Sequence, residues 1–238
     1  MARSPSIVIL TGAGISAESG LHTFRDKNGI WNRVRLEDVA TPEAFAAHPA
    51  RVQKFYNKRR AMLPSVQPNA AHHALARLEK TYDGLVTIIT QNVDDLHERA
   101  GSDSVIHMHG ELNKSLCAAC GTSIPHKGDL SIDSECGHCG AIGRLRPDVV
   151  WFGEMPYQMD RIYELLRDCD LFISIGTSGN VYPAAQFVQE ASHGGAHTLE
   201  INLEPSLGVS DFAETRHGKA GALLPLFVDE VLTGQYRF

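Results

Sequence analysis

The sequence has no long hydrophobic run and no excess of positive charge. No segment approaches the ~20 apolar residues that a membrane span needs, and the apolar run at residues 7–10 is too short for a signal peptide. A net charge of −6, without a block of Lys or Arg, gives no electrostatic basis for nucleic-acid binding. We therefore expect neither a membrane nor a nucleic acid as a direct partner. The 238 residues, 43% of them hydrophobic, allow one α/β domain with or without a small insert.

Cysteine is scarce, and its spacing is specific. Four of the five cysteines form two C-x2-C pairs separated by 15 residues, namely Cys117, Cys120, Cys136 and Cys139. Each pair can place two thiolates on a tight turn, and four thiolates satisfy tetrahedral zinc. Because sites with four cysteine ligands are usually closed, the spacing predicts one structural zinc. It also fits a reducing compartment, by default the cytoplasm, better than a disulfide framework.

Short runs rich in β-branched residues alternate with helical patterns along the chain. Strands are expected at residues 6–11, 85–90, 171–176 and 198–202, with a further one at 105–109. Helices are expected at residues 70–80, 94–100, 157–168 and 183–192. This alternation predicts an α/β fold in which crossover helices connect the strands of a parallel sheet.

Two segments interrupt the alternation. Residues 25–84 separate the first strand-to-helix turn from the second strand, far more than a usual connection, and the helical patterns at 42–62 indicate an inserted helical module. Residues 114–144 hold the cysteine pairs and have too few apolar side chains to fold without a metal. We predict a Rossmann-like domain of residues 1–24, 85–113 and 145–238. The helical insert 25–84 and the zinc-binding module 114–144 would form a small domain.

The first predicted strand runs into a glycine turn, Gly12-Ala13-Gly14, which begins a G-x-G-x-x-A pattern. Such turns let main-chain N–H groups approach a pyrophosphate at the start of a helix, so the pattern predicts phosphate binding. The acidic residue expected ~20 positions later, at the end of the second strand, has no counterpart. The ribose must then be held at other strand ends, where the candidates are Asn202, Glu204 and the turn Gly176-Thr177-Ser178.

Further strings of polar residues lie at or near the predicted strand ends. They are Gln91-Asn92-Val93-Asp94, His107-Met108-His109-Gly110 and RPDVVWFGE at residues 146–154. Together with GAGISAESG-x-x-TFRD, the cysteine pairs, GTS and INLE, they resemble the sirtuins, the family of NAD-dependent protein lysine deacylases, over about residues 7–220. The resemblance implies a Rossmann-type large domain, with NAD and an acyl-lysine peptide entering the interdomain cleft from opposite sides. It implies transfer of the acyl group to ADP-ribose, with release of nicotinamide and free lysine.

The resemblance also implies a role for each matching residue. At the cofactor it places Gly12, Ala13, Gly14, Glu18, Thr23, Phe24 and Arg25 around the pyrophosphate and nicotinamide ribose, Gln91, Asn92 and Asp94 at the nicotinamide, Gly176, Thr177, Ser178, Asn202, Leu203 and Glu204 at the adenosine, and Ala220 at the adenine. Val149, Val150 and Phe152 would line the peptide channel, with the peptide pairing along the main chain of residues 149–151. Residues 23–31 would close as a lid.

Two histidines compete for the catalytic role. His107 and His109 lie two positions apart on a segment expected to be extended, so both side chains point the same way and spacing does not separate them. The family pattern does, because its catalytic histidine directly precedes glycine, as His109 does. Histidine suits a general base because its usual pKa of ~6.5 lies near working pH. We expect His109 to be the base, assisted by Asn92 and Asp94.

The helical insert contains Tyr56 and Arg59, which are three residues apart and share one helix face. On the residues alone, a surface arginine beside a half-buried tyrosine is the favoured interpretation. The pair resembles the Tyr-x-x-Arg of class III sirtuins, which remove succinyl and malonyl groups, and Ala40 matches the small residue that leaves room for a longer chain. A guanidinium and a phenol together can bind a distal carboxylate. We therefore expect desuccinylation with deacetylation retained.

Three other functions stay open from the sequence. A zinc-dependent oxidoreductase would need an open coordination position, which four cysteine ligands do not leave. A mono-ADP-ribosyltransferase shares the chemistry at C1′ of the nicotinamide ribose. A binding module would hold NAD or zinc without turnover. For the favoured deacylase, the partners are acylated-lysine proteins or peptides, and we expect a monomer or a weak oligomer.

Overall fold

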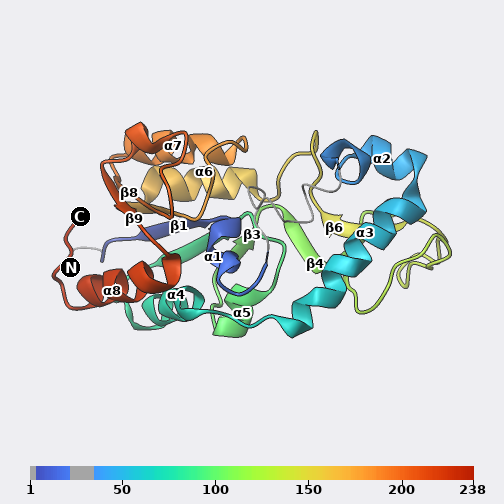
Figure 1. Ribbon diagram of the computed structural model, residues 1–238. Helices are drawn as coiled ribbons and strands as arrows, with labels where there is room; N and C mark the ends of the chain where they lie inside the picture. Colours follow the sequence, from blue (N-terminus) through green and yellow to red (C-terminus); the bar gives the residue numbers. More distant parts are fainter. Residues whose placement is uncertain (1–3, 22–34) are drawn as a thin grey trace.

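A computed structural model describes residues 4–21 and 35–238, and its largest element is a parallel six-stranded sheet in the order β3-β2-β1-β7-β8-β9 (Figure 1). The strands are β1 (Ile7–Thr11), β2 (Val86–Thr90), β3 (Val105–His107), β7 (Leu171–Ile175), β8 (His197–Asn202) and β9 (Glu214–His217). The chain runs outward from β1 on one side and then returns to the other side of β1. This is the doubly wound arrangement of dinucleotide-binding folds, and it confirms the predicted α/β, Rossmann-like class.

Helices cover both faces of this sheet. α4 (Ala70–Thr81) and α8 (Ala220–Leu232) lie on one face, and α6 (Met159–Asp168) and α7 (Phe187–His193) lie on the other (Figure 1). Every residue of β1, β2 and β7 is buried, because β-branched side chains are packed from both sides. One apolar cluster joins the strands to α4 and α8, and a second joins them to α6 and α7.

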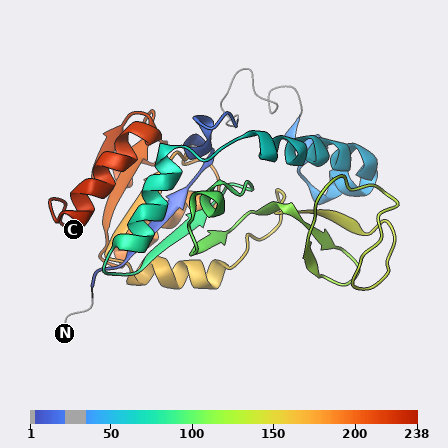
Figure 2. The same ribbon diagram turned by 90° about the horizontal axis from the view of Figure 1, so that it is seen from below.

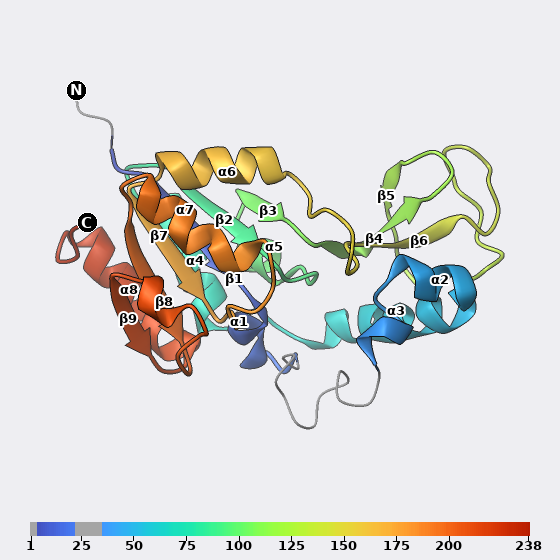
Figure 3. The ribbon, with the colours of Figure 1, turned by 90° about the horizontal axis from the view of Figure 1, so that it is seen from above.

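A smaller region lies beyond one end of the large sheet (Figures 1 and 3). It contains an antiparallel sheet in the order β5-β4-β6, formed by β4 (Gly110–Cys117), β5 (Ser123–Pro125) and β6 (Leu145–Val149). Beside it lie α2 (Pro42–Ala47) and α3 (Pro49–Met62). The helical pattern at 42–62 becomes two helices because His48, with φ −140° and ψ 60°, leaves the helical region before Pro49.

Packing assigns some segments differently from the predicted domain boundaries. α4 falls within the predicted insert 25–84, yet Ala71, Ala74, Leu75 and Leu78 belong to the apolar core of the large sheet. β6 falls within the predicted Rossmann-like segment 145–238, yet it pairs with β4 in the small sheet. Strong periodicity identifies a helix, but it does not say which sheet the apolar face will meet.

The remaining elements are short. They are α1 (Ala13–Ala17), α5 (Leu96–Ala100) and 3-10 turns at Leu36–Asp38, Leu63–Ser65, Ala184–Gln186 and Val209–Asp211. Within residues 4–21 and 35–238, no helix has both the length and the apolar character needed to cross a membrane.

Candidate functional site

The turns after β1 and β7 touch at the carboxyl edge of the large sheet, where strand order reverses. The N–H of Gly14 donates to the carbonyl of Gly176 at 2.8 Å, and the N–H of Gly12 donates to Ile175 at 2.9 Å. A Cβ at Gly14 would lie 2.6 Å from the Cα of Gly176, so no larger residue fits without a shift. These two amides have partners within the protein, and the glycines permit close approach of the two main chains. Ligands of such folds bind beside this switch point.

Ser16, in α1, joins the two loops that meet there. Its Oγ lies 3.1 Å from Nδ2 of Asn92 and 3.2 Å from Oδ2 of Asp94, and the same Nδ2 donates to the carbonyl of Gly12 at 3.1 Å. All three side chains are buried. The structure therefore brings Asn92 and Asp94 together beside the glycine turn. The sequence prediction named Ser16 only as part of the glycine string, because a serine in a helix start carries no signal of its own.

Asp94 is a buried carboxyl group whose hydrogen bonds only partly offset its loss of hydration. Burial raises its pKa, while hydrogen bonds from the N–H of Leu96, at 3.1 Å, and from Ser16 oppose this shift. A carboxylate that is desolvated and held in place binds a neutral hydrogen-bond donor, such as a carboxamide or hydroxyl, more strongly than one in water.

His109 lies in a turn and not at the end of a strand, because β3 stops at His107. The turn is shaped by Gly110, whose φ of +77° favours glycine. Its main chain is held from two sides: Val150 donates to the His109 carbonyl and Tyr157 donates to the Met108 carbonyl, both at 2.9 Å. The position of the imidazole is therefore set by segments far apart in sequence.

The imidazole of His109 is arranged as a base. Its Nδ1 lies 3.1 Å from the carbonyl of Gln91, which can only accept, so Nδ1 carries the proton and Nε2 carries the lone pair. Burial lowers the pKa of His109, and the Gln91 carbonyl partly opposes this. The ring is consequently neutral near pH 7, which is the form a general base requires.

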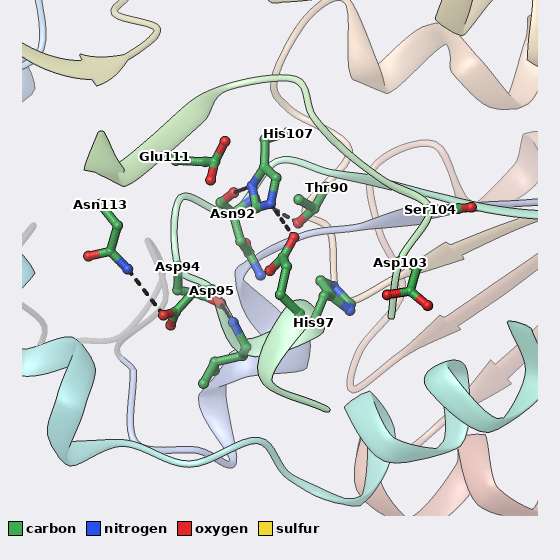
Figure 4. Close-up of polar contacts among 12 residues, drawn as sticks. Thr90, Asn92, Asp94, Asp95, His97, Asp103, Ser104, His107, Glu111 and Asn113 are labelled. Carbon is green, nitrogen blue, oxygen red and sulfur yellow. Dashed lines mark hydrogen bonds and ion pairs between the residues drawn. The ribbon is translucent and has the colours of Figure 1, made fainter. Parts of the chain in front are cut away.

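His107 is in a different electrostatic state. Its Nε2 lies 2.7 Å from Oε1 of Glu98 and its Nδ1 lies 3.4 Å from the carbonyl of Asn92 (Figure 4). Burial alone would lower its pKa, but the hydrogen bond and charge of Glu98 together raise it. Because both ring nitrogens of His107 face acceptors and its pKa is raised, neither nitrogen offers a free lone pair to take a proton from a substrate. The structure therefore separates two histidines that spacing could not.

The candidate adenosine residues come together from three elements. Nδ2 of Asn202 donates to the carbonyl of Thr177 at 2.6 Å, and the carbonyl of Asn202 accepts from Gly218 at 2.9 Å. Oε1 of Glu18 accepts from the N–H of Gly221 at 2.8 Å, at the start of α8, next to Ala220. Leu203 and Glu204 are exposed. The Oγ of Ser178 accepts from Asn180 at 3.3 Å.

The candidate acyl residues are placed by α3. The phenol oxygen of Tyr56 accepts from the indole N–H of Trp151 at 2.9 Å, and burial raises the pKa of Tyr56 to about 12. Burial lowers the pKa of Arg59, against the opposing influence of Tyr56 and Asp94, so the guanidinium lies within electrostatic reach of both. The carbonyl of Ala40, which is buried, accepts from Phe152 at 2.9 Å.

The predicted peptide rail has few open main-chain donors. The amides of Val150 and Phe152 donate to His109 and Ala40, and the amide of Trp151 donates to Oε2 of Glu154 at 2.9 Å. Val149 pairs with Gly110 across the small sheet. A peptide that adds along residues 149–151 would therefore pair with carbonyl oxygens or displace one of these bonds.

The four predicted zinc ligands form one compact cluster. Their sulfur atoms all lie within 4.8 Å of one another, with Cys117 to Cys139 at 3.8 Å and Cys120 to Cys136 at 3.9 Å. Tetrahedral thiolates ~2.3 Å from zinc are about 3.8 Å apart, so the four sulfurs fit the ion. The two C-x2-C pairs lie on turns of the same kind. The N–H of Gly121 donates to the carbonyl of Cys117 and the N–H of Gly140 donates to the carbonyl of Cys136, both at 2.8 Å.

Three predicted cofactor residues, Thr23, Phe24 and Arg25, lie outside the described residues, as does the whole of the predicted lid at 23–31.

Comparison with known proteins identifies similar chains. The sequence profile of the Sir2 family matches residues 12–183. The chain is 57% identical, over 95% of its length and 94% of the other protein, to a protein of Vibrio vulnificus called NAD-dependent protein deacylase. It is 54% identical, over 98% of its length and 86% of the other protein, to a protein of the same name in Salmonella typhimurium. Among solved structures, a Sir2 homolog in complex with NAD is 42% identical, covers 97% of this chain and 91% of that chain, and has a TM-score of 0.88.

Proposed function

The chain belongs to the Sir2 family and is an NAD-dependent protein lysine deacylase, and we propose that it removes succinyl and malonyl as well as acetyl groups. The observation that carries the proposal is the Tyr56 phenol. Because its oxygen already accepts from Trp151, its own hydrogen is directed to another acceptor. With Arg59 one helical turn away, α3 offers a neutral donor and a cation to the distal carboxylate of an acyl chain.

The proposed NAD-binding residues divide into two groups, one for each end of the cofactor. NAD, when bound, supplies the ADP-ribose that accepts the acyl group. We assign its adenosine to the segments at Gly176–Ser178, Asn202–Glu204 and Ala220, and its nicotinamide end to Gln91, Asn92 and Asp94. In support, these segments meet at the switch point of the sheet, where such folds bind dinucleotides. A 29% identical Sir2 structure, which covers 96% of this chain and 92% of that chain with a TM-score of 0.78, is a complex with a deacetylated p53 peptide and 3′-O-acetyl-ADP-ribose.

In this proposal His109 takes a proton from a ribose hydroxyl through Nε2. Asn92 and Asp94, held by Ser16, orient the carboxamide and ribose, and the turn at Gly110 keeps the imidazole in place. The acid limb of kcat/KM should lie below pH 6.5, because burial lowers the pKa of His109 and the neutral ring persists to lower pH. His109→Ala should abolish turnover, so that no pH profile remains. An unchanged rate in that variant would contradict the assignment.

The zinc site is assigned a structural role. Four sulfur ligands complete a tetrahedral shell and leave no open coordination position. The zinc-dependent oxidoreductase is therefore not favoured, and mono-ADP-ribosyl transfer has no specific observation behind it. Zinc would hold the two turns of the module together without touching the reaction.

The test of acyl preference compares kcat/KM on succinyl-lysine and acetyl-lysine versions of one peptide, for the wild type and Arg59→Met. We expect the variant to lose at least about tenfold on the succinyl peptide, the scale of a charge-assisted hydrogen bond, and little on the acetyl peptide. Lys58→Ala, exposed on the same helix, is the matched control. Equal loss on both peptides would remove the carboxylate-binding role of Arg59.

Compartment and oligomeric state belong to the same proposal. Thiols that bind zinc must stay reduced, which supports the cytoplasm. We infer a monomer or weak oligomer. Cell fractionation and light scattering after gel filtration test these two points.

A further inference from the structure

α3 presents two sets of side chains to two different parts of the molecule. Tyr56 and Arg59, three residues apart, form the proposed acyl-binding pair. Gln53, Asn57 and Arg60, spaced at i, i+4 and i+7, share a neighbouring face of the helix. The proposed function uses only the first set, whereas the second makes hydrogen bonds to segments far away in the sequence.

Gln53 and Asn57 bind the main chain around the cysteine cluster. Nε2 of Gln53, which is buried, donates to the carbonyl of Leu145 at 3.1 Å. Nδ2 of Asn57 donates to the carbonyl of Leu130 at 2.8 Å, and Oδ1 of Asn57 accepts from the N–H of Leu130 at 3.0 Å. The Asn57 amide thus pairs with Leu130 as a neighbouring strand would. Leu130 and Leu145 pack with Cys117 and Cys136 in one apolar cluster.

Arg60 extends this contact to the centre of the site. The side chain is 5% exposed; its Nε donates to the carbonyl of Leu112 at 2.6 Å and its Nη1 donates to the carbonyl of Gly128 at 3.2 Å. The same Nη1 reaches Oδ1 of Asn57 at 2.9 Å. Leu112 in turn donates to the carbonyl of Val93 at 2.9 Å, in the loop that carries Asn92 and Asp94.

These bonds are strong determinants of where the helix sits. A buried guanidinium and a buried amide that lose their carbonyl partners remain desolvated and unpaired. This costs far more free energy than the loss of the same hydrogen bonds at the surface, where water replaces the partner. α3 itself is rigid, so any shift of the face that carries Asn57 and Arg60 also shifts Tyr56 and Arg59. Lys54 and Lys58, on another face of the helix, are exposed. Figure 2 shows α3 lying along the loops of the zinc module.

We propose that Gln53, Asn57 and Arg60 are positioning residues through which the zinc module sets the place of Tyr56 and Arg59, and hence the preference for acyl chains that end in a carboxylate. This inference rests on the proposed desuccinylation. It adds that selectivity depends on a second region, which holds no acyl-binding residue of its own. Because coupling between two sites is reciprocal, the docked helix should also slow the release of zinc.

The experiment measures three quantities in Asn57→Ala, Arg60→Lys and the control Lys58→Ala. They are kcat/KM on a succinyl-lysine peptide, kcat/KM on the matching acetyl-lysine peptide, and the rate of zinc transfer to a chromogenic chelator. For Asn57→Ala we expect the succinyl-to-acetyl ratio to fall about tenfold, mainly through KM on the succinyl peptide, since misplacement by ~1 Å costs one to two orders of magnitude. Zinc transfer should be faster. Arg60→Lys, which keeps the charge and loses the fork, should fall between the wild type and Asn57→Ala.

Asn57→Asp provides a partial rescue, because one carboxylate oxygen still accepts from Leu130 and Arg60, whereas the other replaces the donor that faced the Leu130 carbonyl. It should recover part of the ratio and of the slow zinc transfer. If Asn57→Ala fails to fold by circular dichroism, Gln53→Ala, which removes one hydrogen bond, takes its place with the same expected direction.

The positioning role is overturned if Asn57→Ala lowers both activities by the same factor, or changes zinc transfer and leaves the ratio intact. Arg59→Met measured in parallel distinguishes this from failure of the proposed function. A wild type whose succinyl preference does not depend on Arg59 removes the proposed function, and the inference with it. A preference that depends on Arg59 but not on Asn57 or Arg60 removes the inference alone.

Discussion

The large sheet and the zinc module are built on different physical principles. In the sheet, each residue of β1, β2 and β7 is buried, and apolar clusters cover both faces. Around the zinc module the apolar cluster is small: Cys117, Leu130, Cys136 and Leu145. The sheet is ordered by burial of apolar surface, whereas the module depends on four thiolates and one ion.

The difference also separates chemistry from support. His109, Asn92 and Asp94 lie in loops at the edge of the large sheet, where strands buried on both faces hold them. The zinc module contributes main-chain carbonyls, such as those of Leu130 and Gly128, that hold α3. In our proposal, one region therefore carries the reaction, and the other holds the helix that selects its substrate.

Removal of zinc should have the largest effect, and it should affect the zinc module far more than the large sheet. Cys117→Ser, or exhaustive chelation, should abolish deacylation, because the module unfolds and α3 loses its docking face. The large sheet should keep its cooperative thermal transition by circular dichroism, since its apolar clusters do not include the cysteine cluster. Metal analysis should give one zinc per active chain, and added zinc should restore activity after chelation.

The control for zinc removal is Cys169→Ser, which should retain zinc and activity, because Cys169 is buried at the C-terminal end of α6, in an apolar cluster of the large sheet. Full turnover by a metal-free chain would contradict the structural dependence on zinc.

The same difference explains what could be predicted from the sequence. The buried strands were predicted because a short apolar run, such as residues 171–175, indicates by its composition alone that the strand is buried on both faces. The cysteine cluster was predicted because the spacing of ligands reflects the geometry of the ion. In contrast, α8 was missed: its residues are apolar on all sides, and Pro225 interrupts the pattern. β9 was missed because an edge strand with charged Glu214 and Arg216 reads as a loop.

The fine geometry of the site was beyond the sequence for another reason. Which histidine is neutral depends on Glu98, which pairs with His107, and on the Gln91 carbonyl, which faces His109. Ser16 becomes central only when the loops after β1 and β2 meet. Such contacts between distant segments leave no local pattern.

After zinc removal, the next largest effect is expected from truncation of an apolar side chain in the large sheet. Ile88, in β2, is fully buried, so Ile88→Ala should lower the free energy of unfolding by about 3 kcal/mol through lost burial and a residual cavity. Urea denaturation followed by circular dichroism measures this, with zinc in excess so that the module stays loaded. A loss below about 1 kcal/mol would show that the sheet does not depend on tight packing at this position.

Acid should destabilise the sheet through a buried histidine. Burial, with a contribution from the neighbouring His73, lowers the pKa of His72 from 6.5 to about 4. Below pH 6.5 the imidazole of His72 binds a proton in the unfolded chain, but in the folded chain it stays neutral down to about pH 4. The free energy of unfolding therefore falls as the pH is lowered across this range. The loss should be about 2 kcal/mol between pH 7.5 and pH 5, at ~1.4 kcal/mol per pH unit.

His72→Gln tests this linkage, because glutamine can still accept from the N–H of Asn69 in the capping box of α4 but does not titrate. Urea midpoints at the two pH values should lie closer together in this variant, whereas the exposed His73→Gln, which removes only the lesser cause of the shift, should narrow their difference much less. Zinc content is measured alongside, because acid also protonates the thiolates. An unchanged slope in His72→Gln would assign the acid sensitivity to other groups.

The smallest effect is expected for an isoleucine in the other region. Ile142 lies in the zinc module and is 64% exposed, and it is held by a main-chain bridge to Glu135 that does not involve its side chain. Ile142→Ala should change the free energy of unfolding by less than about 0.5 kcal/mol and leave the rate of zinc transfer to a chelator unchanged. The same substitution at Ile88 removes a fully buried side chain. If both isoleucines prove equally costly, the zinc module depends on apolar burial after all, and the contrast between the two regions fails.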